Sequence, residues 1–202
     1  RRVQPLPAQG EAAPRLGGVR CLRARPPHRS CLARAPPLSL RPLCRIGTVA
    51  PVRDFPEDQW DRLLALMLTS PFLLARYSWE ALAASGDGRI CVIASAHALT
   101  ASPFKAGYVA AKHGVLGLVK TLALEGAQVG IAATAVCPAF VRTPLAEQQV
   151  AERGLDAVIE RHAVKRLLEP AEVADVVAFL LGPGGRGITG VPVPVDLGWT
   201  AA

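Results

Sequence analysis

The chain has 202 residues, half of them apolar and 19% charged, a composition typical of an ordinary globular domain and unlike that of a disordered or fibrous protein. Its net charge is +7, but residues 1–45 hold ten Arg and a single acid, and the remaining 13 basic and 15 acidic residues sum to −2. Because residues 46–202 are slightly acidic, they offer no basic surface patch, which argues against nucleic acid and anionic membranes as partners.

The cysteines and the apolar runs indicate the compartment. The five Cys form no C-x-x-C pair and have no His at ligand spacing, so we expect neither a metal site nor a disulfide framework; they are Cys21, Cys31, Cys44, Cys91 and Cys137. The longest apolar runs, within 63–74 and 173–181, are shorter than the roughly 20 residues of a membrane span. The sequence therefore predicts a cytoplasmic protein without a membrane partner.

Residues 1–48 are dominated by Arg and Pro. Eight Pro lie among ten Arg, so no apolar period of a helix or a strand persists there, and we expect this segment to be disordered. A transit peptide is also rich in Arg, but it needs an amphipathic helix, which this Pro spacing prevents. Because the chain starts at Arg1 and its one Met is Met67, a fragment or a mistranslated start is the expectation.

Regular patterns begin at Asp54. Asp54 is predicted to cap a helix that has Pro56 in its first turn and runs to about residue 84. A continuous apolar run at 89–95 predicts a buried parallel strand, and 107–128 a second long helix. A further buried strand is expected at 131–137, closed by Pro138.

The last part of the chain continues the alternation. Polar helical sequence fills 144–163, a helix is predicted from 169 to 181, and a short strand at 191–195. Alternating strands and helices predict an α/β fold, the C-terminal portion of a Rossmann-like doubly wound parallel sheet. Such a sheet has about six strands, and three are recognisable here without a glycine fingerprint, so the amino-terminal strands are expected to be missing.

A tyrosine and a lysine four residues apart carry the strongest chemical signal. Tyr108 and Lys112 lie in a predicted helix, which brings them onto one face, and the nearby ammonium can lower the pKa of the phenol toward working pH. Ser95 ends the preceding strand, where an open α/β sheet binds its ligand. The three residues together suit a proton transfer with Tyr108 as the base.

This pattern, with Cys-Pro-Ala-Phe-Val-Arg-Thr-Pro at 137–144, resembles the short-chain dehydrogenase/reductase family from about residue 49 to residue 202. The stretches 94–97, 102–114 and 196–201 are similar to those of bacterial D-3-hydroxybutyrate dehydrogenases. The resemblance implies NAD-linked oxidation of 3-hydroxybutyrate to acetoacetate by a homo-oligomer, a tetramer. It divides the chain into a partial dehydrogenase domain at 49–202 and a segment at 1–48 foreign to the family.

The resemblance also assigns roles to residues. It implies catalysis by Ser95, Tyr108 and Lys112, the last two also contacting the cofactor together with Pro138, Val141 and Thr143. It implies binding of the substrate by His97, Lys105, Gln149 and Trp199. Each of these four assignments has a plainer alternative. His97 is alternatively a strand-end histidine bonded to backbone, and Lys105 a solvated loop charge. Gln149 is alternatively a good helix former, and Trp199 an aromatic side chain that packs the C-terminus.

Three departures from the family bear on activity. Met67 aligns with an Asn of the family's proton relay, and a thioether cannot replace an amide there. Ala139 stands where Gly is usual, a mild change unless the backbone needs a positive φ. Cys-Arg-Ile-Gly at 44–47 replaces the Asn-Asn-Ala-Gly strand end, and a substrate-binding Gln of that loop is lost. We therefore expect impaired activity, with residues 1–48 read out of frame.

Two other hypotheses remain. The chain is alternatively a non-catalytic dehydrogenase remnant that serves as an interaction module, or has no function. Binding of nucleic acid through the Arg-rich segment depends on charge alone, because that segment has no aromatic residues for stacking on bases.

Overall fold

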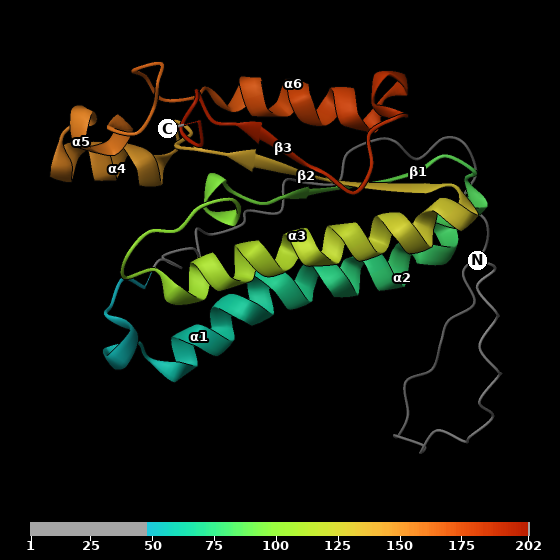
Figure 1. Ribbon diagram of the computed structural model, residues 1–202, viewed down its shortest axis with the longest axis horizontal. Helices are drawn as coiled ribbons and strands as arrows, with labels where there is room; N and C mark the ends of the chain where they lie inside the picture. Colours follow the sequence, from blue (N-terminus) through green and yellow to red (C-terminus); the bar gives the residue numbers. More distant parts are fainter. Residues whose placement is uncertain (1–47, 202) are drawn as a thin grey trace, which may run out of the picture. The chain divides into compact units, whose positions relative to one another are not determined.

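Three parallel strands form the sheet of the computed structural model, which describes residues 48–201 (Figure 1). The strands are β1 (Gly88–Ile93), β2 (Ile131–Pro138) and β3 (Pro192–Val195), in the order β1-β2-β3. Gly88 pairs with Ile131, and Ala135 with Pro192. The predicted parallel α/β architecture is confirmed. The predicted disorder concerns residues 1–48, and of these the structure describes Thr48 alone.

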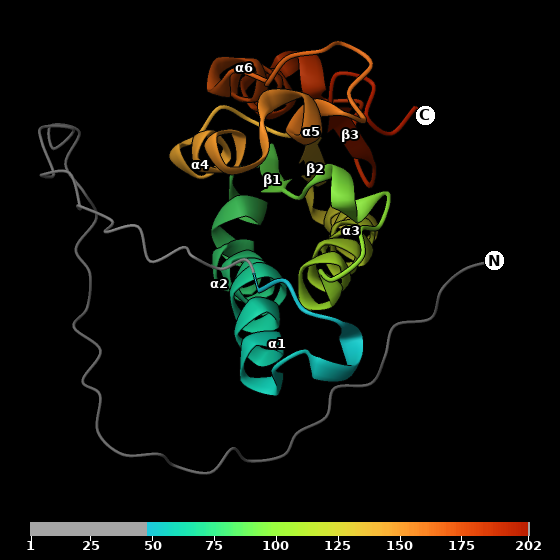
Figure 2. The ribbon, with the colours of Figure 1, turned by 90° about the vertical axis from the view of Figure 1, so that its left-hand side faces the viewer.

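Helices cover both faces of this sheet. α2 (Ser70–Ala84) and α3 (Ala106–Gly126) lie on one face and α6 (Pro170–Leu181) on the other, as the two views show (Figures 1 and 2). α6 begins as predicted: Glu169 and Glu172 form a reciprocal capping box, which satisfies backbone N–H groups of the first turn. Within residues 48–201 no helix has the length and apolarity needed to span a bilayer.

The core lies between α3 and β2. Val115 and Val119 of α3 pack with Ala133, Ala135 and Cys137 of β2, and all are buried. The small strand residues let the helix approach closely, and apolar area removed from water at such a contact stabilises a fold by about 25 cal/mol per Å².

The first helix differs from the prediction. Asp54 does not cap it but ends a short 3-10 turn, η1 (Val52–Asp54), and its carboxylate accepts from Arg53 Nε at 3.0 Å. α1 (Glu57–Leu64) follows Pro56 as N-cap, with no side-chain cap. The wrong assignment has a simple cause, because Pro56 has extended backbone and itself takes the capping position.

A π-helical segment, η2 (Ala65–Thr69), separates α1 from α2 and contains Met67. The sequence pattern predicted one uninterrupted helix here. A π-helical turn adds one residue to the hydrogen-bonded ring, so it rotates the following side chains relative to an ideal helix.

β1 is less buried than predicted. Of its residues Gly88 alone is buried, whereas β2 is buried at every position except Ala132. In the described part of the chain β1 pairs with β2 at one edge, and no strand pairs with its other edge. A groove of about 480 Å³ runs between β1 and α2, lined by Met67, Cys91 and Lys112 among others.

The polar helical sequence at 144–163 forms two helices. α4 (Pro144–Arg153) and α5 (Leu155–Ile159) are separated by Gly154, whose φ of +82° and ψ of 151° are accessible almost only to glycine. Both helices lie near the carboxyl ends of the strands (Figure 1). Val158 and Ile159 of α5 pack with Leu167 in a second, smaller core.

Candidate active site

Ser95 lies two residues beyond β1, at the carboxyl end of the sheet, and is buried. Its backbone is extended, with φ −174°, and its Oγ accepts a hydrogen bond of 3.1 Å from the N–H of His97. That bond caps a short 3-10 turn, η3 (Ala96–Ala98). The hydroxyl is therefore held in one orientation by the turn that follows it.

Tyr108 and Lys112 lie on one face of α3, as the helical spacing predicts. Lys112 Nζ is 5.8 Å from the centroid of the Tyr108 ring and donates to the carbonyl oxygen of Ile93 at 3.0 Å. The ammonium thus lies against the ring and is anchored to the end of β1. Tyr108 faces the pocket described below, whereas Lys112 lines the groove along β1.

The pKa of Tyr108 differs from the expectation. Burial raises the pKa of this phenol above its ordinary value, and a hydrogen bond with the Ser95 side chain opposes that rise. Burial also lowers the pKa of Lys112, because a desolvated ammonium is less stable. The shift is therefore upward, the reverse of the expected lowering, although the ammonium of Lys112 lies over the ring and donates to a backbone carbonyl.

His97 is buried among polar and aromatic groups. Its Nε2 is 2.7 Å from Ser102 Oγ, and its ring meets Tyr108 and Trp199 edge to face, with centroids 5.8 and 4.7 Å away. Burial lowers its pKa to about 4, assisted by the positive charges of Lys105 and Arg161. His97 is therefore neutral at pH 7 and acts as a hydrogen-bonding group without a charge.

One pocket of about 330 Å³ brings most of the predicted substrate residues together. Lys105, at the N-terminus of α3, has its pKa lowered first by burial and then by the positive charge of Arg153. The other predicted residues that line the pocket are Ser95, His97, Tyr108, Val141, Thr143, Gln149 and Trp199. Among the lining residues that the structure describes, Lys105 is the one basic Lys or Arg side chain, and a cation beside apolar walls suits a small anionic molecule.

Two predicted site residues lie outside this pocket. Lys112 lines the groove along β1, and Pro138 ends β2 as a buried residue. Ala139, next to Pro138, does not have a positive φ, so the backbone accommodates alanine there without strain. Thr143 lines the pocket and also caps α4, since its Oγ1 accepts from the N–H of Ala146 at 3.3 Å.

The segment that carries Gln149 is held together at its two ends by a pair of backbone hydrogen bonds. Val141 pairs with Leu168 in an isolated parallel bridge, where Arg142 N donates to Leu168 O at 2.8 Å and Leu168 N donates to Phe140 O at 2.9 Å. α4 and α5 lie in the chain between Val141 and Leu168. The bridge therefore holds both ends of the α4–α5 segment together, next to the pocket that Val141 lines.

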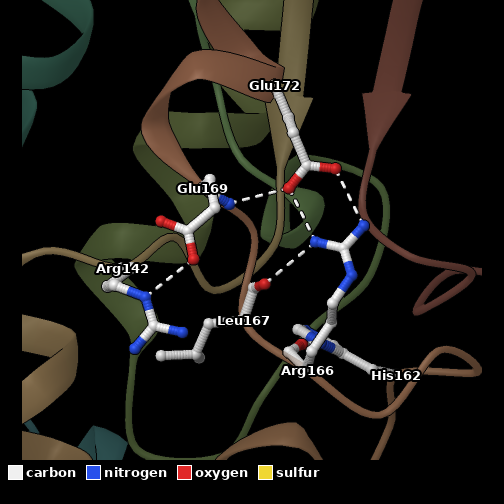
Figure 3. Close-up of polar contacts among 6 residues, drawn as sticks. All are labelled: Arg142, His162, Arg166, Leu167, Glu169 and Glu172. Atoms are coloured by element: carbon white, nitrogen blue, oxygen red, sulfur yellow. Dashed lines mark hydrogen bonds and ion pairs between the residues drawn. The ribbon is translucent and has the colours of Figure 1, made fainter.

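Two ion pairs reinforce the bridge (Figure 3). Arg166 donates to both carboxylate oxygens of Glu172, at 2.6 and 2.8 Å, and Arg142 Nε donates to Glu169 Oε1 at 2.8 Å. The guanidinium of Arg166 and the backbone N–H of Glu169 together lower the pKa of Glu172 to about 2. We call Arg142, Arg166, Glu169 and Glu172 the clasp.

Sequence reasoning missed several residues around the pocket. Phe140 and Leu145 line it, Ser102 bonds His97, and the guanidinium of Arg161 lies 4.6 Å from the centroid of the Trp199 ring. Phe140 lies within the stretch quoted for the resemblance, so its position was a usable signal. Ser102 also begins a stretch quoted for the resemblance, 102–114, whereas Arg161 lies in a turn; only the fold shows that their side chains reach His97 and Trp199. Within residues 48–201 no group of three or more His, Cys, Asp or Glu is arranged to hold a metal ion.

A family model described as enoyl-(acyl carrier protein) reductase matches residues 44–200. The D-beta-hydroxybutyrate dehydrogenase of Rhizobium meliloti (strain 1021) is 42% identical over 164 residues, covering 76% of this chain and 64% of that protein. The protein of the same name from Cupriavidus necator is 37% identical and covers 77% and 65%.

Solved structures give the same result. A 4-hydroxyisoleucine dehydrogenase complexed with NADH is 30% identical with a TM-score of 0.72, covering 77% of this chain and 65% of that one. The chain thus spans slightly less than two thirds of the length of these relatives. Both the sequence and the fold match dehydrogenases over most of this chain, and the chain belongs to the short-chain dehydrogenase/reductase family.

Proposed function

We propose that the pocket is the substrate site of an NAD-dependent dehydrogenase that oxidises 3-hydroxybutyrate to acetoacetate. The observation that carries the proposal is the convergence of Ser95 and Tyr108 with His97, Lys105 and Gln149 on one pocket of about 330 Å³. The similarity to two D-beta-hydroxybutyrate dehydrogenases supports the same substrate class.

The anionic end of the substrate lies near Lys105. Lys105 is the charged partner of the substrate carboxylate, and neutral His97 and the Gln149 amide supply hydrogen bonds. Phe140, Leu145 and Trp199 line the apolar walls, which suit a short carbon chain. A charge-assisted hydrogen bond inside such a pocket is stronger than one in water, so a free acid is preferred over its neutral analogues.

The reacting end lies at Tyr108 and Ser95. Tyr108 takes the proton of the substrate hydroxyl, and the Ser95 hydroxyl donates a hydrogen bond to the substrate oxygen as a carbonyl forms there. The Ser95 Oγ can do so because it accepts from His97 N and still has its own proton to donate. Lys112, against the Tyr108 ring, stabilises the phenolate by its charge.

The residues present fit the nicotinamide end of the cofactor. When bound, the dinucleotide supplies the two-electron acceptor for the carbon that bears the hydroxyl group. Pro138 ends β2, and Val141 and Thr143 follow it at the carboxyl end of the sheet, where α/β folds bind such groups. Lys112 is bonded to the carbonyl oxygen of Ile93 at the end of the neighbouring strand, β1. The strand-to-helix connections 94–105 and 139–143 contain no glycine, so these residues are assigned to the nicotinamide and not to the pyrophosphate.

The substrate class is tested with an acid and its neutral ester. NAD reduction by the 202-residue chain is measured with 3-hydroxybutyrate and with methyl 3-hydroxybutyrate, for the wild type, Lys105→Met and the exposed control Lys165→Met. We expect Lys105→Met to raise the KM for the acid by about tenfold or more and to leave the ester unaffected. Equal effects on acid and ester would contradict the assignment of Lys105. A folded chain that binds no NADH would favour the interaction module instead.

A further inference from the structure

Ser102 contacts the imidazole ring of His97, which can exist in two neutral forms. It lies in the loop between η3 and α3, and its Oγ is 2.7 Å from Nε2 of His97. A neutral imidazole carries a single N–H, on Nδ1 or on Nε2, and the two forms present a donor and an acceptor at opposite ring positions. The partner of Nε2 therefore determines whether Nδ1 is a hydrogen-bond donor or an acceptor toward a ligand.

Nδ1 of His97 is available to the pocket. Within residues 48–201 this atom has no hydrogen-bond partner, and it is not sealed from solvent. His97 lines the pocket together with Lys105, whose ammonium is a donor. An anionic ligand between them needs a proton on Nδ1, because a lone pair there would repel a carboxylate.

We propose that Ser102 is a positioning residue that holds His97 in its Nδ1–H form. The Ser102 hydroxyl donates to Nε2, which leaves the ring proton on Nδ1, and His97 then donates a hydrogen bond to the anionic group of the substrate. The part that concerns the substrate rests on the proposed function. The low pKa of His97, about 4, supports the neutral ring that the arrangement requires.

The tautomer is measured by NMR on the full chain. Long-range ¹H–¹⁵N spectra at pH 7 report which ring nitrogen is protonated, with the His97 signals assigned by their loss in His97→Asn. In the wild type we expect Nδ1 protonated and Nε2 unprotonated, and in Ser102→Ala a shift of population toward Nε2–H. Ser102→Thr keeps the hydroxyl and should keep the wild-type spectrum. A wild type that is mainly Nε2–H, or a Ser102→Ala spectrum equal to wild type, overturns the proposal.

The matched control is Thr100→Val. Thr100 lies in the same loop, and its Oγ1 is buried without a hydrogen-bond partner in the described residues, so the isosteric valine removes a loop hydroxyl that is not hydrogen-bonded to His97. We expect its His97 spectrum to equal that of the wild type. A shift in Thr100→Val as large as in Ser102→Ala would mean that general disturbance of the loop sets the tautomer, which also overturns the proposal.

Binding is measured in the same samples by titration with 3-hydroxybutyrate, following the Nδ1 signal. We expect Ser102→Ala to raise the Kd about tenfold, and Ser102→Thr and Thr100→Val to leave it within about twofold. An unchanged Kd in Ser102→Ala would refute a role in binding. If Ser102→Ala changes the tautomer but the wild type does not bind the acid, the positioning by Ser102 is supported and the proposed function is wrong.

Discussion

The ammonium of Lys112 lies 5.8 Å from the centroid of the Tyr108 ring, and its hydrogen bond to the Ile93 carbonyl holds it there. The strand end therefore positions the cation, and the helix positions the ring. Because burial raises the pKa of Tyr108, the phenolate needs this charge if it is to form near neutral pH.

Replacing Lys112 should shift the pH profile of the reaction. A base is active when deprotonated, so kcat/KM rises with pH through the pKa of Tyr108. Lys112→Met removes the stabilising charge, and we expect the acidic limb of the profile to move to higher pH, with a rate loss at pH 7 of about a hundredfold. Lys120→Met, at an exposed position of the same helix, is the control. An unmoved limb in Lys112→Met would mean that this ammonium does not act on the phenol.

Burial of His97 makes the free energy of unfolding depend on pH. Its folded pKa of about 4 lies below the ordinary 6.5, so the unfolded chain binds the proton more tightly, and stability is lost as pH falls below 6.5. From pH 7 to pH 5 the loss from this group is about 2 kcal/mol. Urea unfolding of wild type and His97→Gln at both pH values checks this: the variant should lose less stability by about that amount, and equal losses would contradict the low pKa.

The clasp should hold the α4–α5 segment at the pocket. Glu172→Gln removes the charge that Arg166 contacts through Nη1 and Nη2. We expect faster amide hydrogen exchange in residues 166–172 and in α4, measured by mass spectrometry. Since the folded pKa of Glu172 is lowered to about 2, its contribution is present above pH 4.5 and is lost as pH falls toward 2. Glu125→Gln, an exposed glutamate of α3, is the control, and equal exchange in both variants would refute the role.

Much of the fold could be predicted because apolar runs mark the strands. The run at 89–95 and the run at 131–137 became β1 and β2, and the spacing of Tyr108 and Lys112 gave their shared helix face. Burial of β1 could not be predicted from its own residues, since burial depends on what pairs with each edge. The hydrogen bond between Ser102 and His97 was equally beyond sequence reasoning, because a loop has no period that sets the direction of a side chain.

Gly154 allows the break between α4 and α5. Its φ of +82° with an extended ψ disfavours any residue with a Cβ, so Gly154→Ala should lower the free energy of unfolding by about 1–3 kcal/mol. Gly117→Ala is the matched comparison, because Gly117 lies inside α3 with open space where the methyl group of an alanine would lie, and alanine there should stabilise by about 0.5–1 kcal/mol. Chemical denaturation measures both, and a neutral or stabilising Gly154→Ala would contradict the assigned backbone.

The central claim, that Tyr108 is the base of a hydroxy-acid dehydrogenase, is tested most directly by comparing the two tyrosines of the chain. The kcat for NAD-linked oxidation of 3-hydroxybutyrate is measured for Tyr108→Phe and for Tyr77→Phe, an exposed position on α2, with NADH affinity measured for both. We expect Tyr108→Phe to lose at least about a hundredfold in kcat with NADH affinity within a few fold of wild type, and Tyr77→Phe to match the wild type. A Tyr108→Phe variant that keeps most of its kcat would contradict the account.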